Sequence, residues 1–251
     1  MNKIICTFMA MVFLFLFCGC GNLETPPASV GESNIPYSSV PSSSEDASSK
    51  EESPVFDFDS YELRLVNPWN SIPEGFNPEL ENIDKAYAGF DGAQFDARAI
   101  DRLHALCDAA KKDGIKLTVI SAYRTNSFQT FNFNRKVDRV MAANPNLTRG
   151  EAEKQAEKVV ARPGTSEHQV GLAVDFNSVE DSFKNTKAYS WLVAHCSDYG
   201  FILRYTEEKQ EKTGIIPEPW HYRYVGVEAA KTMEKENLCL EEFIEKYKKA
   251  E

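Results

Sequence analysis

Residues 162–175, RPGTSEHQVGLAVD, join a turn-rich loop to a short apolar run that ends in an aspartate. The loop carries His168, one of four histidines in a chain of 251 residues, and Asp175 closes the run seven positions later. A second unusual stretch, EPWH, follows at residues 218–221. If the two stretches meet in space, they bring together two imidazoles and two carboxylates, which are side chains that hold catalytic zinc. We therefore expect a metal site where a loop meets the ends of strands.

The periodicity of apolar residues places both stretches in an α+β domain. It predicts one helix from an Asp96 N-cap to Gly114, and others over residues 127–142, 148–160 and 184–199, from about 227 and from about 240. Strands are predicted over residues 115–121, 172–176, 201–205 and 220–225. Thr148 and Glu151 form the pattern of a capping box. Because helices and strands do not alternate regularly, we expect a small, mostly antiparallel sheet surrounded by helices.

The first 55 residues differ in composition from the rest of the chain. Residues 1–20 combine Lys3 with an apolar run and are predicted to be an export signal. The run ends in FCGC at residues 17–20, which resembles the lipobox of bacterial lipoproteins with Cys20 as the lipidated residue, although Phe17 stands where leucine is usual. A secreted protein and an uncleaved N-terminal anchor are the alternatives. Residues 21–55, rich in Ser, Pro and Glu, are predicted to be a disordered tether, leaving residues 56–251 as the folded domain.

Net charge and cysteine spacing exclude several classes of protein. A formal charge of −10 argues against nucleic acid or an anionic surface as partner. Cys107, Cys196 and Cys239 show no CxxC spacing, so the sequence declares no disulfide framework. Cys107 and Cys196 lie among apolar residues of predicted helices, where we expect buried free thiols.

His168, Asp175 and His221 could hold zinc from three separate elements and leave one position open for water. Glu218, three residues before His221, could then act as a general base without binding the metal. The competing interpretation is that each histidine is structural. We interpret His104 and His195 in that way because both fall within predicted helices.

Three motifs in order resemble the VanY-type D-alanyl-D-alanine carboxypeptidases, which are zinc peptidases of bacterial cell-wall metabolism. They are SAYRT at residues 121–125, SxHxxGxAxD at residues 166–175 and ExxH at residues 218–221. The resemblance runs from about Leu65 to the C-terminus. It implies a small antiparallel sheet with helices around it, the fold that these enzymes share with hedgehog-like zinc peptidases.

The resemblance also implies roles for particular residues. His168, Asp175 and His221 would hold one Zn²⁺, and Glu218 would act as general base and then as general acid. Arg124 would bind the substrate and stabilise the oxyanion. Four further residues would contact substrate: Ser166, Gln129, Tyr123 and Trp220. Each has an alternative explanation. Ser166 could orient the loop, and Gln129 could be an ordinary exposed glutamine on a helix. Tyr123 and Trp220 could pack in the core.

The implied activity is removal of the terminal D-Ala from peptidoglycan stem pentapeptides. An L,D-carboxypeptidase acting on tetrapeptides, a peptidoglycan endopeptidase and a non-catalytic, zinc-binding cell-wall-binding lipoprotein are the alternatives. Glu218 argues against the last, because a binding module needs no general base. We expect a monomer held by its lipid at the outer face of the cytoplasmic membrane of a bacterium.

Overall fold

The computed structural model describes residues 54–248, which belong to one compact unit, Ser53–Glu251. The predicted export signal, Cys20 and nearly all of the predicted tether lie outside the described residues. Within residues 54–248, no helix is long and apolar enough to cross a membrane.

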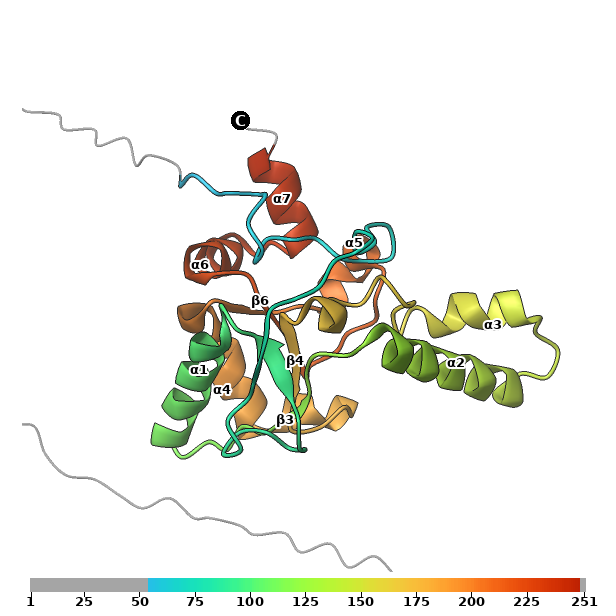
Figure 1. Ribbon diagram of the computed structural model, residues 1–251, viewed down its shortest axis with the longest axis horizontal. Helices are drawn as coiled ribbons and strands as arrows, with labels where there is room; N and C mark the ends of the chain where they lie inside the picture. The colour runs from blue at the N-terminus through green and yellow to red at the C-terminus, as the bar shows by residue number, and fades with distance from the viewer. Residues whose placement is uncertain (1–53, 249–251) are drawn as a thin grey trace, which may run out of the picture. The chain divides into compact units, whose positions relative to one another are not determined.

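A four-stranded antiparallel sheet forms the centre of this unit (Figure 1). Its order is β3 (Val119–Ser121), β4 (Ala173–Phe176), β6 (His221–Tyr224) and β5 (Phe201–Leu203). Every residue of β4 and β6 is buried, as expected for central strands that are covered on both faces. The predicted α+β class with a small antiparallel sheet is therefore confirmed, although the strands are shorter than predicted.

A second sheet pairs β1 (Leu80–Asn82) with β2 (Gln94–Asp96), and the sequence did not predict it. Asp96 ends β2 and is not the N-cap of a helix. Its carboxylate accepts hydrogen bonds from the backbone N–H of Arg98 (3.0 Å) and from the Arg98 guanidinium (2.6 Å). Helix α1 (Ile100–Lys112) begins four residues after Asp96, and its N-cap, Ala99, supplies no side-chain hydrogen bond. The prediction that Asp96 caps this helix is therefore wrong: its carboxylate binds Arg98, two residues later, and not an N–H group of α1.

Helices pack on the sheet through two apolar clusters. Residues of α1 and α4 (Lys187–His195) join the sheet in the larger cluster, whereas α6 (Val227–Glu236) and α7 (Leu240–Lys248) pack around Ile202 of β5 in the other. The helix predicted over residues 184–199 is divided, because the Thr186 side chain accepts the Tyr189 N–H and starts a new helix. Short helical elements complete the unit: η1 (Glu167–Val170), η2 (Asp181–Asn185), η3 (Cys196–Tyr199), η4 (Glu207–Lys209) and α5 (Gln210–Thr213).

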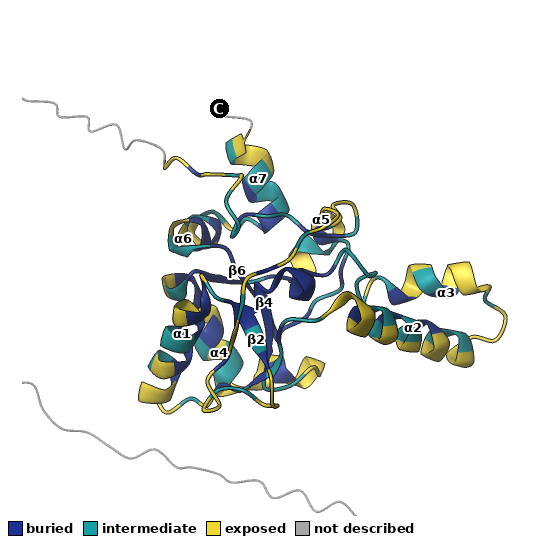
Figure 2. Ribbon diagram, in the orientation of Figure 1, coloured by how far each residue is buried: buried dark blue, intermediate teal, exposed yellow. Residues whose placement is uncertain are grey.

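Helices α2 (Asn126–Ala143) and α3 (Arg149–Ala156) form a hairpin that extends away from the sheet (Figure 1). Phe133, Val137, Ala152 and Ala156 make a small apolar core of its own between the two helices. The outer surface of the hairpin is exposed, in contrast to the buried sheet (Figure 2). The capping box of Thr148 and Glu151 is present as predicted, but α3 ends four residues before the predicted Val160.

Candidate metal and catalytic site

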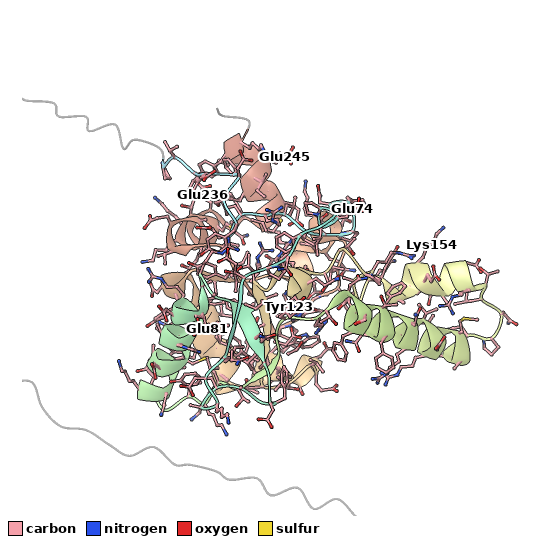
Figure 3. The ribbon with its side chains drawn as sticks, viewed as in Figure 1. Glu74, Glu81, Tyr123, Lys154, Glu236 and Glu245 are labelled. Atoms are coloured by element: carbon pink, nitrogen blue, oxygen red, sulfur yellow. The ribbon has the colours of Figure 1, made fainter. Side chains whose placement is uncertain are left out.

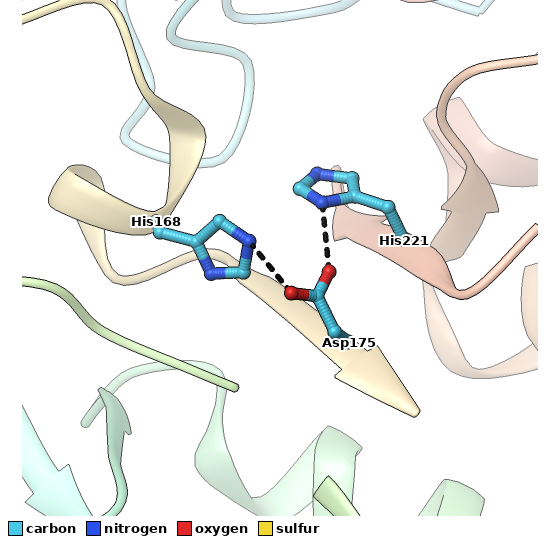
Figure 4. Close-up of side chains that lie close together, drawn as sticks. All are labelled: His168, Asp175 and His221. Carbon is cyan, nitrogen blue, oxygen red and sulfur yellow. Dashed lines mark hydrogen bonds and ion pairs between the residues drawn. The ribbon is translucent and has the colours of Figure 1, made fainter. Parts of the chain in front are cut away.

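The register of the central sheet brings the two sequence motifs together. Asp175 of β4 lies directly opposite His221 of β6, and Ser121 of β3 lies on its other side. His168 approaches from η1, so that His168 Nε2 lies 3.3 Å from Asp175 Oδ2 and His221 Nδ1 lies 3.1 Å from Asp175 Oδ1 (Figure 4). One ligand atom from each of the three residues falls within 4.8 Å of the others. All three side chains are buried.

The loop that carries His168 is fixed by its backbone. Gly171 ends η1 with a φ of +78°, a left-handed conformation that costs glycine little. A Cβ at Gly171 would lie only 3.0 Å from Leu80 Cδ2, so a larger residue would also crowd β1. The carbonyl of His168 accepts the backbone N–H of Arg124 at 3.1 Å, which ties this loop to the end of β3.

The two histidines direct one ring nitrogen each toward Asp175 and hold the other nitrogen in a hydrogen bond. His168 Nδ1 donates to the Ala122 carbonyl at 2.8 Å, and His221 Nε2 donates to Glu167 Oε2 at 3.2 Å. Zinc-binding histidines are held in this way by an outer acceptor that fixes the tautomer and the ring orientation. Burial lowers the pKa of His168 to about 4, whereas for His221 the hydrogen bonds to Asp175 and Glu167 outweigh burial and raise the pKa to about 9. Zinc binding at His221 must therefore displace a proton, as metal binding to a histidine does. The residues present therefore fit a zinc ion with three protein ligands.

Glu218 lies beside this cluster without belonging to it. Its Oε2 is 3.8 Å from His221 Nδ1, and its backbone N–H donates to the Tyr205 carbonyl at 3.0 Å. Burial raises the pKa of Glu218 to about 8. A buried carboxyl group with a raised pKa can hold and release a proton near neutral pH, as a general acid–base must.

Arg124 reaches the cluster from the turn before α2. Its Nη2 donates to Ser121 Oγ at 2.7 Å and to Asp175 Oδ2 at 3.0 Å. Gln129 is fully buried, which corrects the alternative of an exposed helix glutamine. Gln129 Oε1 accepts from Arg124 Nη1 at 3.4 Å, while its Nε2 donates to the Ala161 carbonyl at 2.7 Å. The guanidinium is thus oriented from two sides.

The metal cluster, Glu218 and Arg124 open onto one cleft of about 350 Å³. Ser166 and Trp220 are among its lining residues, as are Arg124, Glu218 and the His–Asp–His cluster. Tyr123 and Gln129 are not. His104 lies elsewhere, where its Nε2 accepts the Asp84 N–H at 3.1 Å, in agreement with a structural role.

A buried network behind His221 was not predicted from the sequence. Glu167 Oε1 accepts from Arg204 Nε at 2.7 Å and from Arg223 Nη1 at 3.0 Å, and all three side chains are fully buried. Each of the strands predicted at residues 201–205 and 220–225 contains an arginine. A buried charge requires a partner, so these two arginines were the sequence signal for a buried ionic network. Cys107, Cys196 and Cys239 are free and buried, and the expectation for the first two is confirmed.

A small antiparallel sheet that presents two histidines and an aspartate to a cleft, with a buried glutamate beside them, defines a metallopeptidase. The profile of the family described as "VanY: D-alanyl-D-alanine carboxypeptidase" matches residues 92–227. A D-alanyl-D-alanine carboxypeptidase of Enterococcus faecalis is 42% identical over 188 residues, which cover 75% of this chain and 67% of that protein. The chain belongs to the VanY family.

Solved structures of relatives share the fold. The VanY D,D-pentapeptidase of a VanB-type resistance cassette, in complex with Zn(II), and VanYB in complex with D-Ala-D-Ala are both 42% identical to this chain, with TM-scores of 0.65 and 0.66. Each match covers 74% of this chain, and 99% and 98% of the respective relatives. The LdcB LD-carboxypeptidase is 34% identical with a TM-score of 0.63, over 72% of this chain and 84% of that one.

Proposed function

We propose that this chain is a zinc-dependent D,D-carboxypeptidase that removes the C-terminal D-Ala from peptidoglycan stem pentapeptides. The convergence of His168, Asp175 and His221 beside Glu218 in one cleft carries this proposal. Relatives that are 42% identical and were solved with Zn(II) and with D-Ala-D-Ala support it.

His168 Nε2, His221 Nδ1 and the Asp175 carboxylate would hold the metal. When bound, zinc supplies a Lewis acid that polarises the scissile carbonyl and acidifies water. Glu218 lies where its carboxylate can take a proton from the attacking water and return it to the nitrogen of the departing D-Ala. Its burial beside His221 keeps that proton away from bulk solvent.

Besides the metal and a base, a carboxypeptidase needs a hydrogen-bond donor for the terminal carboxylate of its substrate. Arg124 can be that donor. A guanidinium can bind a carboxylate through two parallel hydrogen bonds. The Arg124 side chain retains 19% exposure in the cleft while Ser121, Asp175 and Gln129 hold it. Ser166 and Trp220 lie on the wall of the same cleft, where they can contact the peptide.

An L,D-carboxypeptidase is the second candidate, and the likeness to LdcB favours it. Both reactions remove one D-Ala and need the same metal, base and carboxylate donor. They differ in the configuration of the residue before the scissile bond, so the contacts of that residue decide between them.

We further propose that the domain of residues 56–251 works at the cell surface as a monomer. Lipidation of Cys20 would anchor it to the outer face of the cytoplasmic membrane, and residues 21–55 would act as the tether. The lipobox-like FCGC and the Ser/Pro/Glu-rich composition support this arrangement. Peptides ending in D-Ala occur in the wall outside that membrane, where the family acts.

Mass analysis of purified muropeptides tests the activity. Incubation with the zinc-loaded protein should remove one alanine from the pentapeptide, and a chelator should block the reaction. Loss of alanine from the tetrapeptide instead would assign the L,D activity. Cleavage inside the peptide, or no cleavage by protein that binds zinc, would contradict both candidates.

A further inference from the structure

The active-site cleft continues beyond the metal cluster along one side of α2. Asn132, Arg135, Lys136 and Arg139 line this outer part of the cleft. Their spacing of three, four and seven residues places them on one face of the helix, over a rise of about 10 Å. The deep end of the cleft thus carries the catalytic groups, and the outer wall carries a row of cations, here called the α2 cationic wall (Arg135, Lys136 and Arg139).

The charges of this wall are not neutralised by the protein. Among residues 54–248, none of the three cations forms an ion pair, whereas Arg149 and Arg162 of the same region pair with Glu153. The carboxylates that line the cleft, those of Glu167, Asp175 and Glu218, are all buried, whereas the three cations are exposed or half-buried. In a chain with a net charge of −10, three unpaired cations on one wall create a local positive field.

The direction in which the wall faces is set by packing. Phe133 and Val137 of α2 are buried against α3, and Gln129 is hydrogen-bonded to Ala161. These contacts prevent α2 from rotating about its axis. Val159 and Val160, which follow α3, also line the outer cleft and contribute no charge. A ligand in this part of the cleft therefore meets cations on α2.

We propose that the α2 cationic wall is a subsite for a carboxylate of the substrate peptide, located on the N-terminal side of the scissile bond. This rests on the proposed function, because a carboxypeptidase that holds the C-terminus at Arg124 must leave the rest of the peptide in the outer cleft. Arg135 to Arg139 covers a rise of about 6 Å along α2, and an extended peptide advances about 3.3 Å per residue, so about two peptide residues pass along the wall. The ligand is an acidic side chain two to four residues before the scissile bond.

Two matched peptides test the proposal. Both are acetylated pentapeptides ending in Lys-D-Ala-D-Ala, and they carry either Glu or Gln immediately before the lysine. The wild-type protein is expected to show a kcat/KM roughly tenfold higher on the Glu peptide, as two or three exposed charge contacts would give. In the triple variant Arg135→Gln, Lys136→Gln, Arg139→Gln that ratio should fall to about one.

The matched control is Lys154→Gln, which removes one charge from α3 of the same hairpin. Lys154 is exposed and does not line the cleft (Figure 3), so this variant should keep the wild-type ratio. Added salt should lower the wild-type ratio toward one, because exposed charges are screened. A wild-type ratio near one, or a ratio unchanged in the triple variant, would overturn the proposal.

A third peptide, acetyl-Lys-D-Ala-D-Ala, separates this proposal from the proposed function. If the zinc-loaded wild-type protein cleaves none of the three peptides, the proposed function fails. The subsite is then judged by calorimetric affinities of the two pentapeptides for the Glu218→Gln variant. A tenfold preference for the Glu peptide that the triple substitution removes would support it, and equal affinities would overturn it.

Discussion

Glu167 connects the candidate metal ligands to the charges behind them. One carboxylate oxygen accepts from Arg204 and Arg223, and the other accepts from His221 Nε2. The two arginines fix the carboxylate, and the carboxylate in turn fixes the imidazole ring. A carboxylate behind a metal-binding histidine both orients the ring and makes it a stronger ligand. We therefore regard Glu167 as a positioning residue for His221.

Replacing this carboxylate with an amide should weaken metal binding. In Glu167→Gln one of the two oxygens becomes an NH₂ group, which cannot accept from either an arginine or His221 Nε2. Zinc affinity, measured by competition with a chromogenic chelator, should fall about 10- to 100-fold. Glu74→Gln, at an exposed position, serves as the control. A folded Glu167→Gln protein with wild-type zinc affinity would contradict the positioning role.

Glu218 and His168 should respond differently to substitution. Glu218→Gln removes the proton acceptor but leaves His168, Asp175 and His221 in place, so the variant should retain zinc and lose about 10²- to 10⁴-fold in kcat. His168→Ala should lose both zinc and activity. Metal content by elemental analysis, together with kcat on a pentapeptide, separates the two effects. Undiminished turnover by Glu218→Gln would assign the base to another residue.

At the scale of elements, the sequence predicts what local pattern determines. The strand that carries Asp175 was predicted from a short apolar run, and the strand that carries His221 from alternating aromatic and polar residues over 220–225. The capping box at Thr148 was predicted because its partner lies three residues away. β1 and β2 were missed because each has only three residues and β1 is largely exposed, so neither shows a usable alternation.

The residues of the site likewise fall into those that could be predicted from the sequence and those that could not. Spacing and family motifs pointed to the residues that converge in the cleft, but they could not place Gln129 or Glu167. Gln129 is buried because it bonds to Ala161, 32 residues later, and Glu167 because its partners lie on β6 and immediately after β5. Such contacts depend on how elements meet, which local periodicity does not record.

The start of α3 offers a test at this scale. Thr148→Ala removes the side-chain half of the capping box and should destabilise α3 by about 1 kcal/mol. Hydrogen exchange of the α3 amides should then accelerate roughly fivefold, while the central sheet stays protected. Thr130→Ala is the control, because this hydroxyl bonds a backbone carbonyl within α2 and alanine is a better helix former. Equal exchange in both variants would show that the cap does not hold α3.

At the scale of the whole molecule, the buried charges continue from the site to the C-terminal helix. Arg204, already bound to Glu167, also donates to both carboxylate oxygens of Glu241 on α7, at 2.8 Å and 2.6 Å. Asn67, far away in the sequence, donates to the same carboxylate at 3.0 Å. Glu241 therefore links α7 and the segment around Asn67 to Arg204, the arginine that also holds Glu167 behind the metal site.

This connection should make the stability of the fold depend on acid. Burial raises the pKa of Glu241, but Arg204 and the hydrogen bonds outweigh it and hold the pKa below its usual 4.5. A carboxyl group whose pKa is lower in the folded state stabilises the fold above its unfolded pKa, and that contribution is lost as the pH falls through the folded value. The free energy of unfolding should therefore decrease progressively below about pH 4.5.

Glu241→Gln should remove that contribution. The variant should be less stable at pH 7 by about 3 kcal/mol, near the lower end for breaking a buried ion pair, because Arg204 keeps Glu167 as a partner. Its loss of stability between pH 5 and pH 3, followed by urea unfolding, should be shallower than that of the wild type. Glu74→Gln is the control, because Glu74 is exposed and lies far from α7 in the sequence. Parallel pH profiles for the wild type and Glu241→Gln would mean that other carboxylates set the acid limit. A shallower profile in Glu241→Gln alone would show that α7 is held through the same arginine that positions Glu167.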